Sequence, residues 1–142
     1  MRTVARAALA ALITVPLVLS TAAAQDQSEV SFMVFGDPAE LAAYQGLVDA
    51  FEDVHPEIDV KLTHVAGQGD YRQRLAADFA AGTPADVVLL NYRRYGQFAA
   101  RGVLESLGPR LAASTLLHEA DFYEEAISPF RWNGEVMCIP QN

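Results

Sequence analysis

Three neighbouring side chains offer different ways to hold a polar ligand. Asn91, Tyr92 and Arg93 come directly after the apolar run Val87–Leu90 and provide an amide, an aromatic ring and a guanidinium. Ligand sites in largely apolar clefts use such a mixture, with a ring for contact area and a few polar groups for orientation. A surface loop followed by a helix cap is the alternative interpretation of the same residues.

A second polar pair follows another apolar run. Gly36 and Asp37 come directly after the run Glu29–Phe35. If the two runs are neighbouring strands, Arg93 and Asp37 reach the same edge of one sheet. A guanidinium there can pair bidentately with an acidic or phosphorylated ligand, which leads to the hypothesis of an anionic ligand. Alternatively, Arg93 pairs with Asp37 and leaves a neutral site.

The first half of the chain alternates between strand and helix patterns. Apolar and β-branched runs bounded by Gly, Asp and Pro predict strands, whereas apolar residues at spacings of three and four predict amphipathic helices. Pro56 places the end of the first helix before it, and Gly82 closes the second helix. The expected elements are a strand at Glu29–Phe35, a helix from Pro38, an edge strand at Ile58–Val65, a helix containing Tyr71, Leu75 and Phe79, and a buried strand at Val87–Leu90.

This order predicts an α/β fold with a mostly parallel sheet. Right-handed crossovers place the first strand between the other two, in the spatial order 2-1-3. The gap between strands one and three is then the point where the chain direction switches, and ligands bind at such points in open α/β sheets. The predicted ligand-binding residues at this mouth are Gly36, Asp37, Asn91, Tyr92 and Arg93.

The last third of the chain contains shorter signals. Tyr95–Ala100 predicts a short helix, and Ala120–Ile127 predicts an acidic surface helix that ends before Pro129. The Asn-Gly pair at residues 133–134 predicts a tight hairpin turn. We expect the following segment, Glu135–Ile139, to form a fourth strand beyond strand three.

The N-terminal 24 residues have the features of a secretory signal peptide. Two early arginines precede an apolar run and the small residues before Ala24, after which we expect cleavage into the periplasm or outside the cell. Residues 25–142 then form about one domain. The net charge of −8 makes nucleic acid an unsuitable partner. The single cysteine, Cys138, lies in an apolar run and is expected to be a buried structural thiol.

Three segments resemble the carbohydrate-binding group of extracellular solute-binding proteins of ATP-driven (ABC) importers, the group that contains the maltose-binding protein. These segments are VSFMVFGDPAELAAYQGLVDAFEDVHPEIDVKLTHV, AAGTPADVVLLNYRRYGQFAARGVLESL and NGEVMCIPQN. The resemblance implies a periplasmic-binding-protein-like lobe that captures a sugar or oligosaccharide for membrane permease subunits. It covers only the N-terminal part of the first lobe, so we expect a truncated lobe without its second lobe, monomeric, with weak or no binding by itself.

Some sugar binders of this group carry Trp and Asp after the third strand, where this chain has Leu90 and Arg93. We expect no enzymatic activity, no cofactor and no metal site, since the three histidines are far apart in sequence and no helix-borne metal motif is present. The alternatives are a secreted enzyme of the glycoside hydrolase type, which needs two facing carboxylates, and a non-functional truncated remnant.

Overall fold

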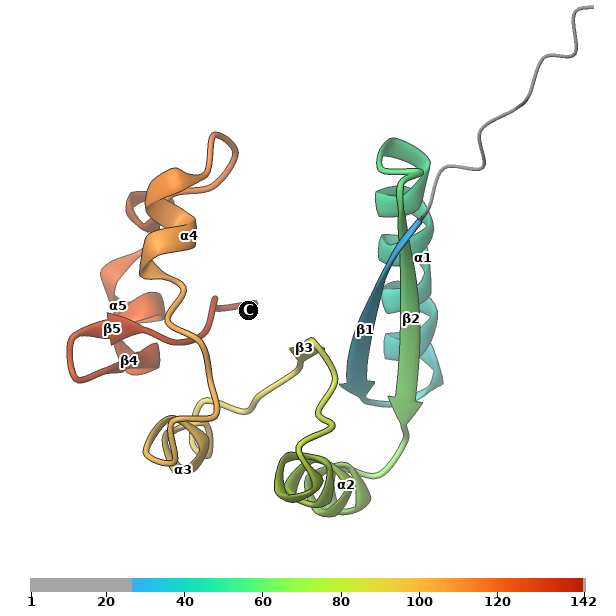
Figure 1. Cartoon of the computed structure of the whole chain (residues 1–142), viewed down its shortest axis with the longest axis horizontal. Coiled ribbons are helices and arrows are strands. Elements are labelled where there is room, and N and C mark those ends of the chain that lie inside the picture. The colour runs from blue at the N-terminus through green and yellow to red at the C-terminus, as the bar shows by residue number, and fades with distance from the viewer. Residues whose placement is uncertain (1–26, 142) are drawn as a thin grey trace, which may run out of the picture.

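The computed structural model describes residues 27–141 and contains a parallel sheet, two long helices and a set of short elements (Figure 1). The predicted signal peptide, with its cleavage after Ala24, lies outside the described residues. Among residues 27–141, no helix has both the length and the apolar character needed to cross a membrane. The elements are β1 (Ser28–Phe35), α1 (Pro38–Val54), β2 (Ile58–Val65), α2 (Gln68–Ala81), β3 (Val87–Val88), α3 (Gly96–Ala99), α4 (Gly108–Ala113), α5 (Glu124–Ile127), β4 (Arg131–Trp132) and β5 (Glu135–Val136), with 3₁₀ turns η1 (Glu119–Asp121) and η2 (Ser128–Phe130).

The sheet has the strand order β2-β1-β3 with all strands parallel, which confirms the predicted order 2-1-3. β1 pairs with β2 over its whole length, from Ser28 opposite Ile58 to Phe35 opposite Val65. On its other side, β1 pairs with β3 through Phe32 and Met33. The central strand is therefore the one with the most continuous apolar sequence, as burial on both faces requires.

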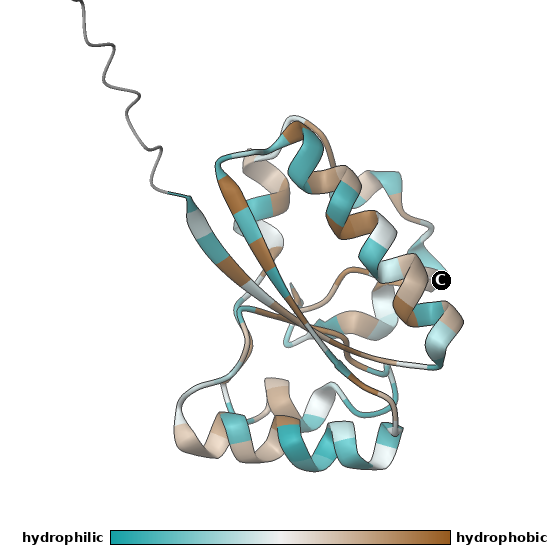
Figure 2. Cartoon of the chain, turned by 90° about the vertical axis from the view of Figure 1, so that its right-hand side faces the viewer, coloured by the Kyte–Doolittle hydropathy of each residue, from teal (hydrophilic) through white to brown (hydrophobic). Residues whose placement is uncertain are grey.

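The two long helices lie on opposite faces of β1. Side chains of a strand alternate between the two faces, so Phe32 and Phe35 point to opposite sides and contact different helices. The ring of Phe32 contacts Tyr44 of α1 edge to face at 5.9 Å between centroids. The ring of Phe35 contacts Tyr71 of α2 at 4.9 Å. Figure 2 shows α1 and α2 on either side of the strands. The alternation of β1 thus assembles three layers around its carboxyl end.

β2 is an edge strand with one polar face, as predicted. Lys61 and Thr63 are exposed, whereas Val60 and Leu62 are half-buried. The N–H of Val60 donates to the carboxylate of Glu52 in α1 at 2.7 Å.

β3 is shorter and more exposed than predicted. The buried strand expected at Val87–Leu90 is regular only over Val87–Val88, and the side chain of Val87 is 49 % exposed. Leu89 continues the pairing with one hydrogen bond, from its N–H to the carbonyl of Met33 at 3.1 Å. Within residues 27–141 only β1 pairs with β3, so one edge of β3 stays open and its apolar side chains face a cavity.

The fourth strand is not in this sheet, and its predicted place beyond strand three was wrong. β5 covers only Glu135–Val136 of the predicted Glu135–Ile139 and pairs antiparallel with β4 in a separate hairpin. The predicted Asn-Gly turn is confirmed, since Asn133 and Gly134 have φ values of 52° and 87°. This tight turn places β5 directly beside β4, so β5 pairs with β4 and not with the open edge of β3.

The predicted helix Ala120–Ile127 is also wrong in its first half. The 3₁₀ turn η1 ends before Phe122, which has extended dihedrals, and α5 begins only at Glu124. Asp121 caps the turn by accepting a hydrogen bond from the N–H of His118 at 2.7 Å. The break lets Phe122 turn inward and pack on a small apolar cluster, an interaction that helical periodicity does not reveal.

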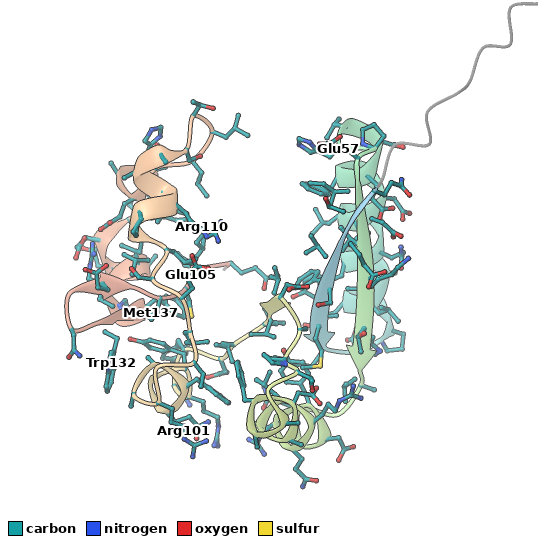
Figure 3. All side chains as sticks on the ribbon, in the orientation of Figure 1. Glu57, Arg101, Glu105, Arg110, Trp132 and Met137 are labelled. Atoms are coloured by element: carbon teal, nitrogen blue, oxygen red, sulfur yellow. The ribbon has the colours of Figure 1, made fainter. Side chains whose placement is uncertain are left out.

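The described residues contain two separate apolar cores. The first core joins the sheet to α2 and α3, with Met33, Tyr71, Leu75 and Phe98 buried. The second core joins α4, α5 and the hairpin, with Leu111, Ile127 and Val136 buried. Trp132 of the hairpin lies against α3 at Gly96 (Figure 3), where an added Cβ would be 3.5 Å from its ring.

Candidate functional site

The mouth of the sheet begins with Gly36, the residue directly after β1. Gly36 is buried and has a φ of 149°, and a Cβ at this position would come within 2.8 Å of the Cβ of Glu40. Only glycine fits here without moving the start of α1. The carbonyl of Gly36 lies 2.8 Å from Nε2 of His64, which ties the end of β1 to the end of β2.

Asp37 is the N-cap residue of α1. Its Oδ1 accepts hydrogen bonds from the N–H groups of Ala39 and Glu40 at 2.8 and 2.9 Å, and Glu40 Oε2 accepts from the N–H of Asp37 at 2.8 Å. This reciprocal arrangement is a capping box at the N-terminus of α1. The carboxylate of Asp37 is thus directed at its own helix.

Asn91, Tyr92 and Arg93 form a tight turn after β3, and all three are exposed. Asn91 Oδ1 accepts a hydrogen bond from the N–H of Arg93 at 3.0 Å. Arg93 Nε donates to the hydroxyl of Tyr92 at 2.7 Å, and the guanidinium carbon lies 5.3 Å from the centre of the same ring. The alternative of an Arg93–Asp37 ion pair is wrong, because the ion pairs among residues 27–141 include neither side chain.

A pocket of about 650 Å³ opens between the end of the sheet and the C-terminal segment. It is closed on one side by β1 and α1, along its length by β3 and the turn after it, and on the other side by α5 and the last residues. Its lining mixes apolar side chains with polar groups that can orient a small ligand. The lining side chains that carry the arguments below are Glu40, Tyr44, Gln68, Asn91, Tyr92, Glu125, Cys138 and Gln141.

The structure brings only two of the predicted site residues into this pocket. Asn91 and Tyr92 line it, whereas Gly36, Asp37 and Arg93 do not. Sequence reasoning missed Glu40 and Tyr44, although their positions three and seven residues after the helix cap mark them as neighbours on one side of α1. Glu125 and Gln141 carry no comparable signal.

The C-terminal wall of the pocket is held to α1 by a pair of amide and hydroxyl contacts. The hydroxyl of Tyr44 donates to Gln141 Oε1 at 3.1 Å, and Gln141 Nε2 lies 2.8 Å from the same hydroxyl. These groups are partly buried and 97 positions apart in the sequence. The contact joins the beginning and the end of the described chain across the pocket.

Tyr71 fixes the spacing of β1 and β3 below the mouth. Its buried hydroxyl donates to the carbonyl of Met33 and accepts from the N–H of Leu89, both at 3.0 Å. Burial raises the pKa of Tyr71 to about 12, so the hydroxyl keeps its proton at any physiological pH. Through these two bonds, the segment that carries Asn91 and Tyr92 is attached to the central strand.

A reactive thiol and a metal site both receive little support from the described residues. Cys138 is half-buried rather than fully buried and borders the pocket, and burial raises the pKa of its thiol to about 11, which disfavours the reactive thiolate. In the part of the chain that the structure describes, no group of three or more His, Cys, Asp or Glu side chains is arranged to hold a metal ion.

The sequence profile of the bacterial extracellular solute-binding proteins matches residues 36–141. The chain belongs to this family, as the resemblance of its three segments implied. The matched region contains the helix cap, the sheet mouth and the C-terminal wall of the pocket. No curated protein matches the chain.

Solved structures with the same fold include several sugar-binding proteins. The sugar-binding protein MalE of Xanthomonas citri is 27 % identical, with a TM-score of 0.72 over 80 % of this chain and 28 % of that one. The ABC substrate-binding protein Lmo0181 of Listeria monocytogenes, solved with cycloalternan, is 27 % identical, with a TM-score of 0.70 over 78 % of this chain and 28 % of that one. The GacH receptor of Streptomyces glaucescens, solved with acarbose, is 26 % identical, with a TM-score of 0.68 over 78 % and 28 %.

The chain thus spans a little over a quarter of the length of these similar structures. It corresponds to a part of a periplasmic-binding-protein-like lobe, and the α/β class and the 2-1-3 sheet are those predicted from the sequence.

Proposed function

We propose that this chain provides part of the ligand site of an extracytoplasmic solute-binding component of an ABC importer, which captures a sugar or oligosaccharide for its permease subunits. The observation that carries the proposal is the position of Asn91 and Tyr92 in the pocket at the sheet mouth. Family membership and the sugar ligands named for similar structures support the same conclusion.

The pocket offers the contacts that a sugar ring needs. The ring of Tyr92 is 50 % exposed, and Arg93 holds it through a hydrogen bond to its hydroxyl, so it presents a fixed face for stacking. The side chains of Asn91 and Gln68 supply amide donors and acceptors for hydroxyl groups, and Glu40 supplies a carboxylate acceptor. Gly36, Asp37 and Arg93 act in this proposal by shaping the mouth around these contacts.

Transport without catalysis is the preferred role. A glycosidase needs two carboxylates that face each other across the scissile bond. Glu40 and Glu125 both line the pocket, but Glu40 is engaged by the N–H of Asp37, and Glu125 lies on a helix of four residues. The similar structures named above are binding proteins. The proposal includes action outside the cytoplasm as a monomer after cleavage behind Ala24, with no cofactor and no nucleic acid partner.

The test is ligand-observed NMR on the secreted and processed chain with maltotriose. Because this chain supplies only part of the contacts, we expect a dissociation constant of roughly 1–10 mM, equivalent to a binding free energy near −3 to −4 kcal/mol. Tyr92→Ala should weaken binding about threefold to tenfold through lost ring contact. Tyr123→Ala removes a tyrosine that is 85 % exposed and outside the pocket, and should change nothing. Equal losses for the two variants would contradict the proposal.

A further inference from the structure

The acidic and basic side chains that line the pocket are all acidic in residues 27–141. Glu40 contributes a carboxylate from the first turn of α1, and Glu125 contributes one from α5 on the opposite side. No lysine, arginine or histidine is among the lining residues of this pocket in residues 27–141. The other polar lining groups are the neutral side chains of Tyr44, Gln68, Asn91, Tyr92, Cys138 and Gln141.

The guanidinium groups near the pocket are not among the residues that line it. Arg93 donates to the hydroxyl of Tyr92, and its guanidinium carbon lies 5.3 Å from the centre of that ring. Arg72 and Arg94 line an adjoining hollow of only about 20 Å³, which shares five lining residues with the large pocket, namely Phe35, Gln68, Leu89, Leu90 and Asn91. The expectation of an anionic ligand rested on Arg93, and this geometry removes its basis.

Glu40 cannot easily turn away from a ligand. Its Oε2 is held by the N–H of Asp37 at 2.8 Å, so the carboxylate keeps its place at the pocket edge. The positive end of α1 offsets part of this charge. Glu125, which like Glu40 is exposed, has no comparable anchor, and this lets it adapt to a bound molecule. Both carboxylates repel a ligand of the same charge.

We infer that Glu40 and Glu125 make this pocket discriminate against anionic saccharides, such as oligogalacturonates or sugar phosphates, in favour of neutral or amine-bearing ones. This inference rests on the proposed function and adds a charge criterion to it. Two carboxylates that line the pocket should together give about a tenfold preference for a neutral trisaccharide over its uronate counterpart.

The experiment is a protein-observed NMR titration of the processed chain with maltotriose, trigalacturonate and a glucosamine trimer at slightly acidic pH. The double variant Glu40→Gln/Glu125→Gln removes both charges, and Gln at position 40 still accepts the hydrogen bond of the capping box. The matched control is Glu29→Gln/Glu57→Gln, which changes the net charge equally at exposed sites outside the pocket, with Glu57 beyond the far end of α1 (Figure 3).

We expect the wild-type chain to bind maltotriose and the glucosamine trimer about tenfold more tightly than trigalacturonate. In the pocket double variant, the ratio of the trigalacturonate to the maltotriose dissociation constant should fall about tenfold, because the loss of charge acts on the anionic ligand in addition to any change in hydrogen bonding that both ligands share. Equal or tighter trigalacturonate binding by the wild type, or the same fall in the control variant, would overturn the charge criterion. Absence of shifts at Asn91 and Tyr92 with all three ligands would instead contradict the proposed function.

Discussion

The two walls of the pocket are built in different ways. The wall formed by β1, α1 and β3 depends on parallel pairing between strands that are about 30 to 55 residues apart, and on side chains that alternate across β1. The opposite wall is formed by α5, η2 and the last residues, and it belongs to a part of the chain (α4, α5 and the β4-β5 hairpin) whose short elements are joined mainly to their sequence neighbours. Figure 1 shows these two parts on either side of β3.

The sheet part positions the site residues, and the C-terminal part closes the pocket. Asn91 and Tyr92 are attached to the sheet, through β3 and the hydroxyl of Tyr71, and the sheet has the larger core. The second wall has only three buried core residues and meets α1 through Gln141. We therefore expect the sheet part to determine the stability of the chain and the second part to determine how open the pocket is.

The largest effect should come from truncating a core residue in the sheet part. Leu75→Ala removes a side chain that is 1 % exposed in α2 and should lower the free energy of unfolding by about 3 kcal/mol. Ile127→Ala, equally buried in the smaller core, should cost less because its surroundings can collapse around the gap. Urea unfolding monitored by circular dichroism gives both values. A larger loss for Ile127→Ala would reverse the comparison.

A smaller effect should follow from removing the hydroxyl that joins β1 to β3. Tyr71→Phe deletes the hydrogen bonds to Met33 and from Leu89, but the N–H of Leu89 keeps its bond to the carbonyl of Met33. The expected cost is about 1 kcal/mol of unfolding free energy. Hydrogen exchange should show the amide of Leu89 opening faster, while amides of the β4-β5 hairpin stay unchanged. Uniform acceleration in both parts would contradict a local role.

The hairpin turn should be sensitive to backbone conformation rather than to packing. Gly134 has a φ of 87°, and a Cβ added there would have no atom within 4 Å, so Gly134→Ala meets no clash but must adopt an unfavourable left-handed conformation. The expected cost is about 1 kcal/mol. The exposed Gly46 in α1 provides the opposite control, since Gly46→Ala should stabilise the chain by up to about 1 kcal/mol. Thermal unfolding of the two variants compares these effects, and a stabilised Gly134→Ala would contradict the backbone explanation.

The smallest effect concerns pH and the start of β3. The side chain and N–H of Ser31 donate to Asp86 at 2.5 and 2.8 Å, and these bonds lower the pKa of Asp86 below its ordinary value of 3.8. A lowered folded-state pKa stabilises the fold above pH 3.8, and the gain is lost as the pH falls through the folded pKa. Urea unfolding at several pH values should therefore find Asp86→Asn less stable than the wild type near pH 7, with the difference shrinking below pH 3.8.

The sequence predicted β1, β2 and the two long helices well, because each has a pattern that extends over many residues. The continuous apolar run of β1, the polar face of Ile58–Val65 and the helix start at Pro38 each determine a long element. The second part depends on single contacts, such as Phe122 entering the small core and the Asn133-Gly134 turn selecting a local partner strand. No period in the sequence encodes such contacts, so the helix Ala120–Ile127 and the fourth strand of the sheet were predicted wrongly.

In the candidate site, the sequence predicted which residues lie near the sheet mouth but not how their side chains are oriented. The topology placed Asn91 and Tyr92 at the sheet mouth, and the structure finds both in the pocket. The orientation of Arg93 depends on the neighbouring hydroxyl of Tyr92, and that of Asp37 depends on the cap of α1. Side-chain partners of this kind are chosen locally and cannot be inferred from strand order.

A crystal structure of the processed chain soaked in concentrated maltotriose would decide whether the pocket at the sheet mouth is the sugar site. We expect sugar density in the pocket, with one ring against Tyr92 and hydroxyl groups within hydrogen-bond distance of Asn91 and Glu40. Sugar bound at a different surface, with this pocket empty at the same concentration, would contradict the proposed site.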